Sequence, residues 1–355
     1  MGEELSPKTF DANLPDDFEQ WEGCNCYNQA ARHSAQEIHK VFNVIFKKNR
    51  PDPVLRAYLK RKYDLTDEAI NRYILSPPPG NTAQQLLQQG FYHDDLIGVP
   101  GFYKAENGEV RFRQYYSTDF GIAVRSESGK IIGILFHFTS QGGRTKTQYG
   151  WLSTRLQQRG TPSGAPIGWV GKAGQYMIYD ELLGKRRPAL PMELDKRGSL
   201  FIADSFFKAA ACHHHYDARA LFASGYRNIS SMSDAVRSHA ERIGSPLRVV
   251  LTPDAYWRNN VNLIAVYLRV IDGIYRDCYP IWIAIWPPEL GKQIDQVIRG
   301  GHADHIKPKR ISKVFLPYIC KWAETETEKG TKGAADLLDL AIMVREKIVD
   351  WERKL

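Results

Sequence analysis

Short apolar runs alternate with helical stretches in the second half of the chain, and this alternation constrains the fold more than any other feature. The apolar runs cover 199–203, 220–223, 248–252 and 282–286, and the helical stretches between them cover 205–215, 231–242 and 261–276. Short apolar strands that alternate with helices are typical of a mostly parallel sheet with helices on both faces. The sequence therefore predicts an α/β fold over residues 198–308.

Changes of pattern along the chain predict four parts. They are a helical N-terminal segment (1–80), a mixed α+β platform (81–197), the α/β domain (198–308) and a helical C-terminal tail (309–355). In the first part, Ile38 and Phe42 lie at helical spacing within a helix predicted over 18–48. In the platform, strand-like runs at 115–125 and 130–138 flank a turn, as in a β-hairpin.

The charge balance favours a polyanionic partner. Lys and Arg total 48 against 40 Asp and Glu, which gives a formal net charge of +8. Excess positive charge raises the local concentration of polyanions such as nucleic acids. No apolar run reaches the roughly 18–20 residues that a membrane span needs, and residues 1–20 show no secretory signal. We therefore expect a cytoplasmic protein without a membrane partner.

Three aspartates follow strand-like runs of the predicted sheet. Asp204 ends the run at 200–203, Asp254 follows the run at 249–253, and Asp295 lies beyond the last strand. Ligands of open α/β sheets bind outside the carboxyl ends of the strands, so these side chains are candidates for one site. Converging carboxylates repel each other unless a cation lies between them, and Mg²⁺ suits such oxygen ligands. The alternative for Asp204 is that it caps the following helix.

The segment Leu200-Phe-Ile-Ala-Asp-Ser-Phe-Phe-Lys-Ala209 resembles the first motif of the TOPRIM domain, the metal-binding core of DnaG-type primases. In this motif a strand ends in Glu-Gly, and Asp204 and Ser205 stand at those two positions. Lys208 and Ala209 match the continuation that is typical of the plasmid- and phage-borne primase-like branch. The resemblance therefore implies a TOPRIM-like sheet preceded by a primase-like platform.

Two further segments extend the resemblance. Asp254 matches the first acidic residue of the Asp-x-Asp motif, whereas Tyr256 replaces the second. The segment Lys292-Gln-Ile-Asp-Gln296 is similar to the Lys-Gly-Ile-Asp-Asp motif, in which Gln296 replaces the last Asp. Similarity to the primase core covers about residues 54–306.

The resemblance implies DNA-templated primer synthesis in the replication of a mobile element, with single-stranded DNA as template and nucleoside triphosphates as substrates. Asp204, Asp254 and Asp295 would be the catalytic residues, and Asp254 and Asp295 would hold Mg²⁺ or Mn²⁺. It also implies a replication or helicase partner. Two alternatives stay open, the first because Asp204, Tyr256 and Gln296 depart from the motifs and the second because a nuclease would use the same metal site. One is a catalytically inactive nucleic-acid-binding accessory protein of a replication or defence system, and the other is a TOPRIM nuclease.

Basic and aromatic residues alternate in the Gly- and Ser-rich stretch at 141–175. Cations that neutralise phosphates, interleaved with rings that stack on bases, are typical of a track for a single strand. The candidate residues for nucleic-acid or nucleotide binding are Arg144, Lys146, Arg155, Lys172 and Trp151, together with Lys208. The alternative is a solvated loop whose aromatic rings pack into the core.

Overall fold

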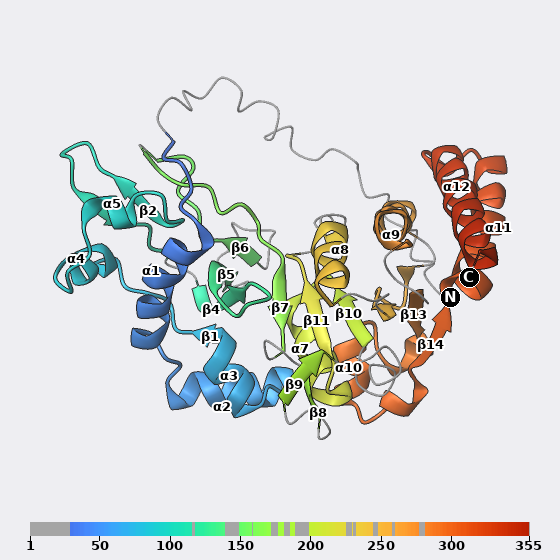
Figure 1. Cartoon of the computed structure of the whole chain (residues 1–355), viewed down its shortest axis with the longest axis horizontal. Coiled ribbons are helices and arrows are strands. Elements are labelled where there is room, and N and C mark those ends of the chain that lie inside the picture. Colours follow the sequence, from blue (N-terminus) through green and yellow to red (C-terminus); the bar gives the residue numbers. More distant parts are fainter. Residues whose placement is uncertain are drawn as a thin grey trace, which may run out of the picture.

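The predicted α/β fold is confirmed by the computed structural model of the chain, whose centre is a six-stranded, mostly parallel sheet flanked by helices (Figure 1). The structure describes residues 29–115, 118–138, 149–157, 159–171, 177–180, 185–188, 199–224, 229, 232–243, 248–257, 260–276 and 281–354. No helix within these ranges is both long and apolar enough to cross a membrane.

Four parallel strands form the middle of the six-stranded sheet, and they lie where the apolar runs predict them. They are β10 (Ser199–Ala203), β11 (Arg219–Phe222), β12 (Arg248–Leu251) and β13 (Ile281–Ile285). The strand order is β14-β13-β12-β10-β11-β7, so β10 and β12 are neighbours. The two edge strands, β7 (Gly168–Val170) and β14 (Lys307–Arg310), are antiparallel to their neighbours and were not predicted.

Side chains of the central strands alternate between two cores, as the period of two in a strand requires. Leu200 and Ile202 pack against α8 (Met232–Ile243) and α9 (Val261–Ile274). Phe201 and Ala203 face the opposite way, toward the helices α7 (Phe206–Tyr216) and α10 (Ile294–Arg299). Burial on both faces explains why these strands are apolar at nearly every position.

A second, four-stranded sheet in the order β1-β4-β5-β6 combines three strands of the predicted platform with one strand from the segment before it. Its strands are β1 (Ile74–Leu75), β4 (Thr118–Arg125), β5 (Ile131–Phe138) and β6 (Tyr149–Trp151). One face packs on α1 (Ala35–Lys48). The other face shares a core with the six-stranded sheet, because Phe120 and Ile122 belong to the same buried cluster as Phe201 and Phe206. The two sheets are therefore joined by one continuous core.

Helices α2 (Pro53–Tyr63) and α3 (Asp67–Tyr73) border this shared core. The ring of Tyr63 stacks on Phe207 of α7, with centroids 3.8 Å apart and planes 9° apart. The remaining short elements are α4 (Thr82–Leu87), α5 (His93–Leu96), β2 (Phe102–Lys104), β3 (Val110–Phe112), β8 (Met177–Asp180) and β9 (Lys185–Pro188).

The first helix begins later than the pattern predicts. Its N-cap is Ser34, whose side chain accepts a hydrogen bond from the Glu37 backbone while the Glu37 carboxylate accepts one from the Ser34 backbone. This reciprocal capping box satisfies two backbone donors at the helix start. The helix α1 therefore starts at Ala35, residues 29–34 are not helical, and residues 18–28 lie outside the described ranges.

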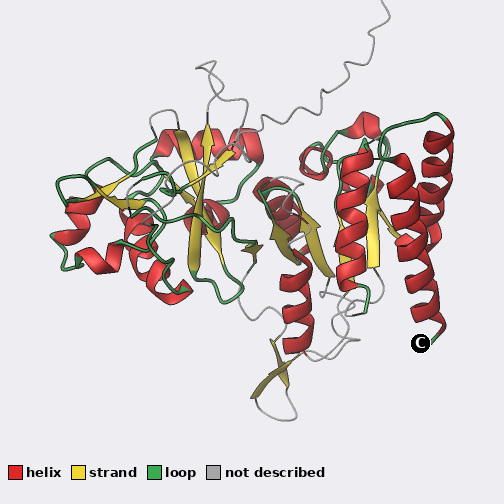
Figure 2. Ribbon diagram, turned by 90° about the horizontal axis from the view of Figure 1, so that it is seen from above, coloured by secondary structure: helices red, strands yellow, loops and turns green. Residues whose placement is uncertain are grey.

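The C-terminal part contains the two α-helices α11 (Leu316–Glu328) and α12 (Ala334–Arg353). Both contribute to the core on the α9 face of the six-stranded sheet. Seen from above, they lie at the opposite end of the molecule from the antiparallel platform sheet (Figure 2).

Candidate functional site

Two of the three predicted carboxylates meet at the carboxyl ends of neighbouring strands. Asp204 follows β10 and Asp254 follows β12, and the two strands run parallel. Pairing continues past the end of β12, where the backbone N–H and the hydroxyl of Thr252 both donate to the Ile202 carbonyl, at 3.0 and 2.8 Å. Thr252 thereby fixes how the chain leaves the sheet on its way to Asp254.

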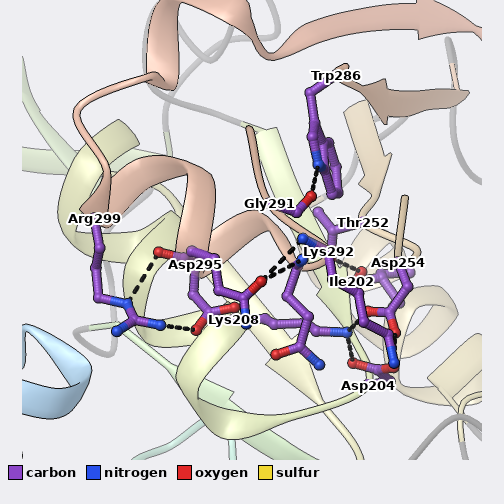
Figure 3. Close-up of polar contacts among 12 residues, drawn as sticks. Ile202, Asp204, Lys208, Thr252, Asp254, Trp286, Gly291, Lys292, Asp295 and Arg299 are labelled. Atoms are coloured by element: carbon purple, nitrogen blue, oxygen red, sulfur yellow. Dashed lines mark hydrogen bonds and ion pairs between the residues drawn. The ribbon is translucent and has the colours of Figure 1, made fainter. Parts of the chain in front are cut away.

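The side chain of Lys208 lies between these two carboxylates (Figure 3). Its Nζ is 2.6 Å from Oδ1 of Asp204, one helical turn earlier, and it also donates to Oδ1 of Asp254. Lys208 is only 1% exposed. We call Asp204, Lys208 and Asp254 the inner cluster. The N-cap of α7 is Ser205, so Asp204 pairs with Lys208 rather than occupying the cap position.

Burial and charge act against each other in the inner cluster. Burial opposes the charge on Lys208, but the two carboxylates outweigh it and raise the pKa of this ammonium. Burial raises the pKa of Asp204, although the nearby Lys208 favours its ionised form. A buried charge is tolerated only when it is paired, so the three side chains depend on one another.

The third predicted carboxylate, Asp295, turns toward a different partner. It lies in the first turn of α10, and its Oδ2 is 3.2 Å from Nη2 of Arg299, one turn later. The Arg299 guanidinium also donates to the Lys62 carbonyl of α2. Burial raises the pKa of Asp295, against the effect of Arg299 and Lys208. We call Asp295 and Arg299 the outer pair, which Figure 3 shows beside the inner cluster.

The arrangement of these carboxylates does not fit a divalent ion. Each carboxylate already has a basic partner, and the Lys208 ammonium lies between Asp204 and Asp254, where a bridging ion would need to be. Within the described part of the chain, no group of three or more His, Cys, Asp or Glu side chains is arranged to hold a metal. The ammonium supplies positive charge between the converging carboxylates, so it reduces their repulsion without a metal.

The two positions that lack the motif carboxylates have other roles. Gln296 caps its own helix, because its Oε1 accepts hydrogen bonds from the backbone of Lys292 and Gln293 at 2.9 and 3.2 Å. Tyr256 is 56% exposed at the edge of the sheet. One further cation approaches this edge: Nζ of Lys292 is 3.8 Å from Oδ2 of Asp254.

The predicted nucleic-acid contacts do not form one described surface. Arg144, Lys146 and Lys172 lie outside the described residues. Arg155 is exposed in the loop after β6, and the backbone there is tied to Gln29. Trp151 is half-buried and donates its indole N–H to the Ser224 hydroxyl at 2.7 Å, so it packs between the two sheets. Because Lys208 is buried, its ammonium is turned to carboxylates rather than to solvent.

The role of Lys208 as an internal cation was not predicted from the sequence. One signal was present, since Asp204 and Lys208 are four residues apart and side chains at this spacing meet on a helix. Asp295 and Arg299 repeat the same spacing. The sequence did not indicate that one of these pairs would be joined by a third charge from another strand.

Comparison with known proteins relates the fold of this chain to that of primases. No protein-family model and no curated protein matches the sequence. Among solved structures, a DNA primase domain from Pseudomonas aeruginosa is similar, with a TM-score of 0.53 and 12% sequence identity over 88% of this chain and 95% of that one. The RNA polymerase domain of Mycobacterium tuberculosis primase DnaG is similar as well, with a TM-score of 0.53 and 12% identity over 90% and 99%.

A third similar structure is a DnaG primase catalytic domain bound to single-stranded DNA, with a TM-score of 0.52 and 12% identity over 89% of this chain and 95% of that one. These structures match most of this chain and nearly the whole of their own, so the likeness extends beyond the six-stranded sheet. The chain has the fold of the DnaG-type primase catalytic domain.

Proposed function

We propose that this chain is a primase-like protein that binds single-stranded DNA with a carboxylate rim balanced by an internal lysine instead of a divalent ion. The observation that carries this proposal is the position of Lys208 between Asp204 and Asp254 at the carboxyl edge of a primase-type sheet. Nucleic acid as the partner is supported by the formal net charge of +8 and by the similar DnaG catalytic domain that binds single-stranded DNA.

The organisation that goes with this function is also a proposal. Residues 198–308 would be a TOPRIM-like domain, between the platform (81–197) after a helical N-terminal segment (1–80) and a C-terminal tail (309–355). The ending Lys208-Ala209 of the first motif supports an origin in the plasmid or phage branch. In such a system the protein would act as an accessory factor of replication or defence, recruited by a helicase or another replication protein.

Primer synthesis from nucleoside triphosphates is the second candidate, and the primase catalytic fold favours it. For Mg²⁺ or Mn²⁺ to reach the carboxylates, the Lys208 ammonium would have to leave the inner cluster. The two candidates therefore differ in whether activity depends on a divalent ion and on the Asp254 carboxylate.

One experiment with two readouts separates these candidates. Binding of a labelled single strand is measured by fluorescence anisotropy with EDTA and with Mg²⁺ or Mn²⁺, and primer synthesis is followed with labelled nucleotides under the same conditions. We expect binding that is unchanged by EDTA and no primer product. A primer product that is lost in Asp254→Asn would overturn the metal-free proposal in favour of synthesis.

The matched control is Asp272→Asn, since Asp272 forms an ion pair with Lys347 on the C-terminal helix α12, outside the rim. This variant should behave as the wild type in both readouts. If the wild type binds neither single strands nor duplex at low salt, the nucleic-acid proposal itself is wrong.

A further inference from the structure

A pocket of about 300 Å³ lies directly beside Asp254, at the carboxyl ends of β12 and β13. Aromatic rings and prolines form most of its wall. They are Pro253, Tyr256, Trp257, Trp286, Pro288 and Tyr318. None of the described residues that line it is charged. The pocket is therefore suited to a flat, uncharged ring system, and its volume is at the lower end of the roughly 300–1,000 Å³ of small-ligand sites.

The aromatic residues of this pocket divide into a buried frame and an exposed pair. Trp257 and Trp286 are 4% and 6% exposed, and the Trp286 indole N–H donates to the Gly291 carbonyl at 2.7 Å. The two tyrosines, Tyr256 and Tyr318, are 56% and 38% exposed. Tyr318 also makes an edge contact with Trp257, with ring centroids 5.8 Å apart. The exposed rings of Tyr256 and Tyr318 therefore lie on a pocket wall that the buried tryptophans hold in place.

Basic residues lie next to the residues that line this pocket. The Ala255 backbone, which lines it, donates to the Lys292 carbonyl at 2.8 Å, and the exposed Lys292 side chain lies by Asp254. On the other side, Ile285 of the pocket wall pairs with Lys307, the first residue of β14. Lys307 and Lys309 are exposed on this edge strand. A single strand needs this combination of stacking rings and nearby cations.

We propose that this pocket holds one nucleobase of a bound single strand, stacked on Tyr256 and Tyr318, while Lys307 and Lys309 contact the adjoining phosphates. The inference rests on the proposed function and adds the place where a base is held. It also gives helix α11 a function, because Tyr318 belongs to that helix. Tyr256, which stands where the motif has a carboxylate, is then a stacking residue rather than a vestige.

The test compares two labelled strands of equal length, an oligodeoxythymidylate and an abasic strand with the same phosphates. The full-length wild type and Tyr256→Ala/Tyr318→Ala are titrated with each strand by fluorescence anisotropy. Loss of stacking on one base predicts about tenfold weaker binding of the base-containing strand, given the usual contribution of base–aromatic stacking. Binding of the abasic strand should not change.

Two control variants separate rings from charges. Tyr256→Phe/Tyr318→Phe keeps both rings and should bind as the wild type. Lys307→Ala/Lys309→Ala should weaken binding of both strands alike and reduce the dependence of affinity on salt, because fewer phosphates are neutralised.

A second measurement needs no variant. A strand that carries the fluorescent base 2-aminopurine should lose emission when the wild type binds it, since stacking on the tyrosines quenches the base. If the wild type binds both strands but Tyr256→Ala/Tyr318→Ala binds the base-containing strand equally well, or if 2-aminopurine is not quenched at any position, the nucleobase site is wrong and the proposed function stands. If the wild type binds neither strand, both are wrong.

Discussion

The inner cluster and the outer pair use the same local pattern, but their cations are buried to very different extents. In both, an aspartate pairs with a cation four residues later on a helix at the carboxyl edge of the six-stranded sheet. The cation of the inner cluster, Lys208, is 1% exposed and serves two carboxylates, whereas the side chain of Arg299 is 28% exposed and serves one. Spacing on a helix brings the charges together, but the depth of burial determines how much the protein depends on them.

Among the substitutions at this edge of the sheet, Lys208→Met should cause the largest loss of unfolding free energy. Methionine fills a similar volume but leaves Asp204 and Asp254, whose side chains are only 16% and 19% exposed, close together without the ammonium between them. Breaking a buried pair in this way typically costs about 3–5 kcal/mol of unfolding free energy. Urea denaturation measures the loss, with Lys347→Met as the control, because Lys347 also pairs with one aspartate but is 38% exposed. A loss as small as that of the control would mean that burial of the lysine does not determine how much its ion pairs stabilise the protein.

The same variant sharpens the argument about the divalent ion. With the ammonium gone, the two carboxylates are free to bind a cation, so Mn²⁺ should raise the melting temperature of Lys208→Met through ligand linkage. The wild type, whose rim is already balanced, should show no such rise. An equal rise in both proteins would mean that Lys208 does not exclude the ion.

Alkaline pH offers a second way to separate the two cations. The folded pKa of Lys208 is raised above its ordinary value of 10.5, so its contribution is complete below that value and is lost as the pH rises through the folded pKa. The difference in unfolding free energy between the wild type and Lys208→Met should therefore shrink as the pH rises above 10.5. The corresponding difference for Arg299→Met should stay constant, because arginine keeps its proton. Equal trends for both variants would contradict this prediction.

A smaller effect is expected for Arg299→Met at neutral pH. Solvent screens the Arg299 guanidinium, which is 28% exposed, but the Asp295 carboxylate that it pairs with is only 7% exposed. We therefore expect a loss of about 2 kcal/mol of unfolding free energy, between the values for an exposed and a buried pair. Asp295→Asn/Arg299→Met should recover most of this loss, since it removes the uncompensated carboxylate as well. Chemical denaturation of the three proteins provides the test, and a loss as large as that of Lys208→Met would remove the distinction between the two sites.

Lys292→Ala should cause the smallest loss of stability. Its side chain is 60% exposed, and its Nζ is 3.8 Å from Oδ2 of Asp254. Exposed pairs of this kind contribute less than about 0.5 kcal/mol. If the melting temperature of Lys292→Ala were clearly lower than that of the wild type, the exposed Lys292 would contribute more to the inner cluster than its distance from Asp254 indicates.

The sequence predicts the centre of the fold better than its edges. Strands β10 to β13 are apolar because both of their faces are buried, and such runs are visible without a structure. The edge strand β14 reads Lys-Pro-Lys-Arg and β7 is only three residues long. The first has no apolar pattern and the second is too short to show one, and pairing at an edge depends on which segment the tertiary fold brings alongside. The late start of α1 was readable, because Ser34 and Glu37 have the spacing of a capping box.

The candidate site was also predictable only in part from the sequence. That Asp204 and Asp254 lie at one edge follows from two parallel strands, which the alternation of strands and helices predicts. The burial of Lys208 could not be predicted, because lysine on a helix is usually exposed and only the packing of α7 against the sheet hides it. The aromatic pocket was equally hidden, since it combines Tyr256 and Trp286 with Tyr318 from a helix that follows the sheet in sequence.

Strand β7 comes from the platform in sequence but pairs with β11 of the six-stranded sheet, through Val170 and Ala220 among others. An excised fragment that begins at residue 199 would leave the β11 edge unpaired, and such an edge readily recruits strands from other molecules. It would also uncover Phe201 and Phe206, which the platform helps to bury. A chimeric protein that contains the six-stranded sheet would therefore also need to include residues 168–170.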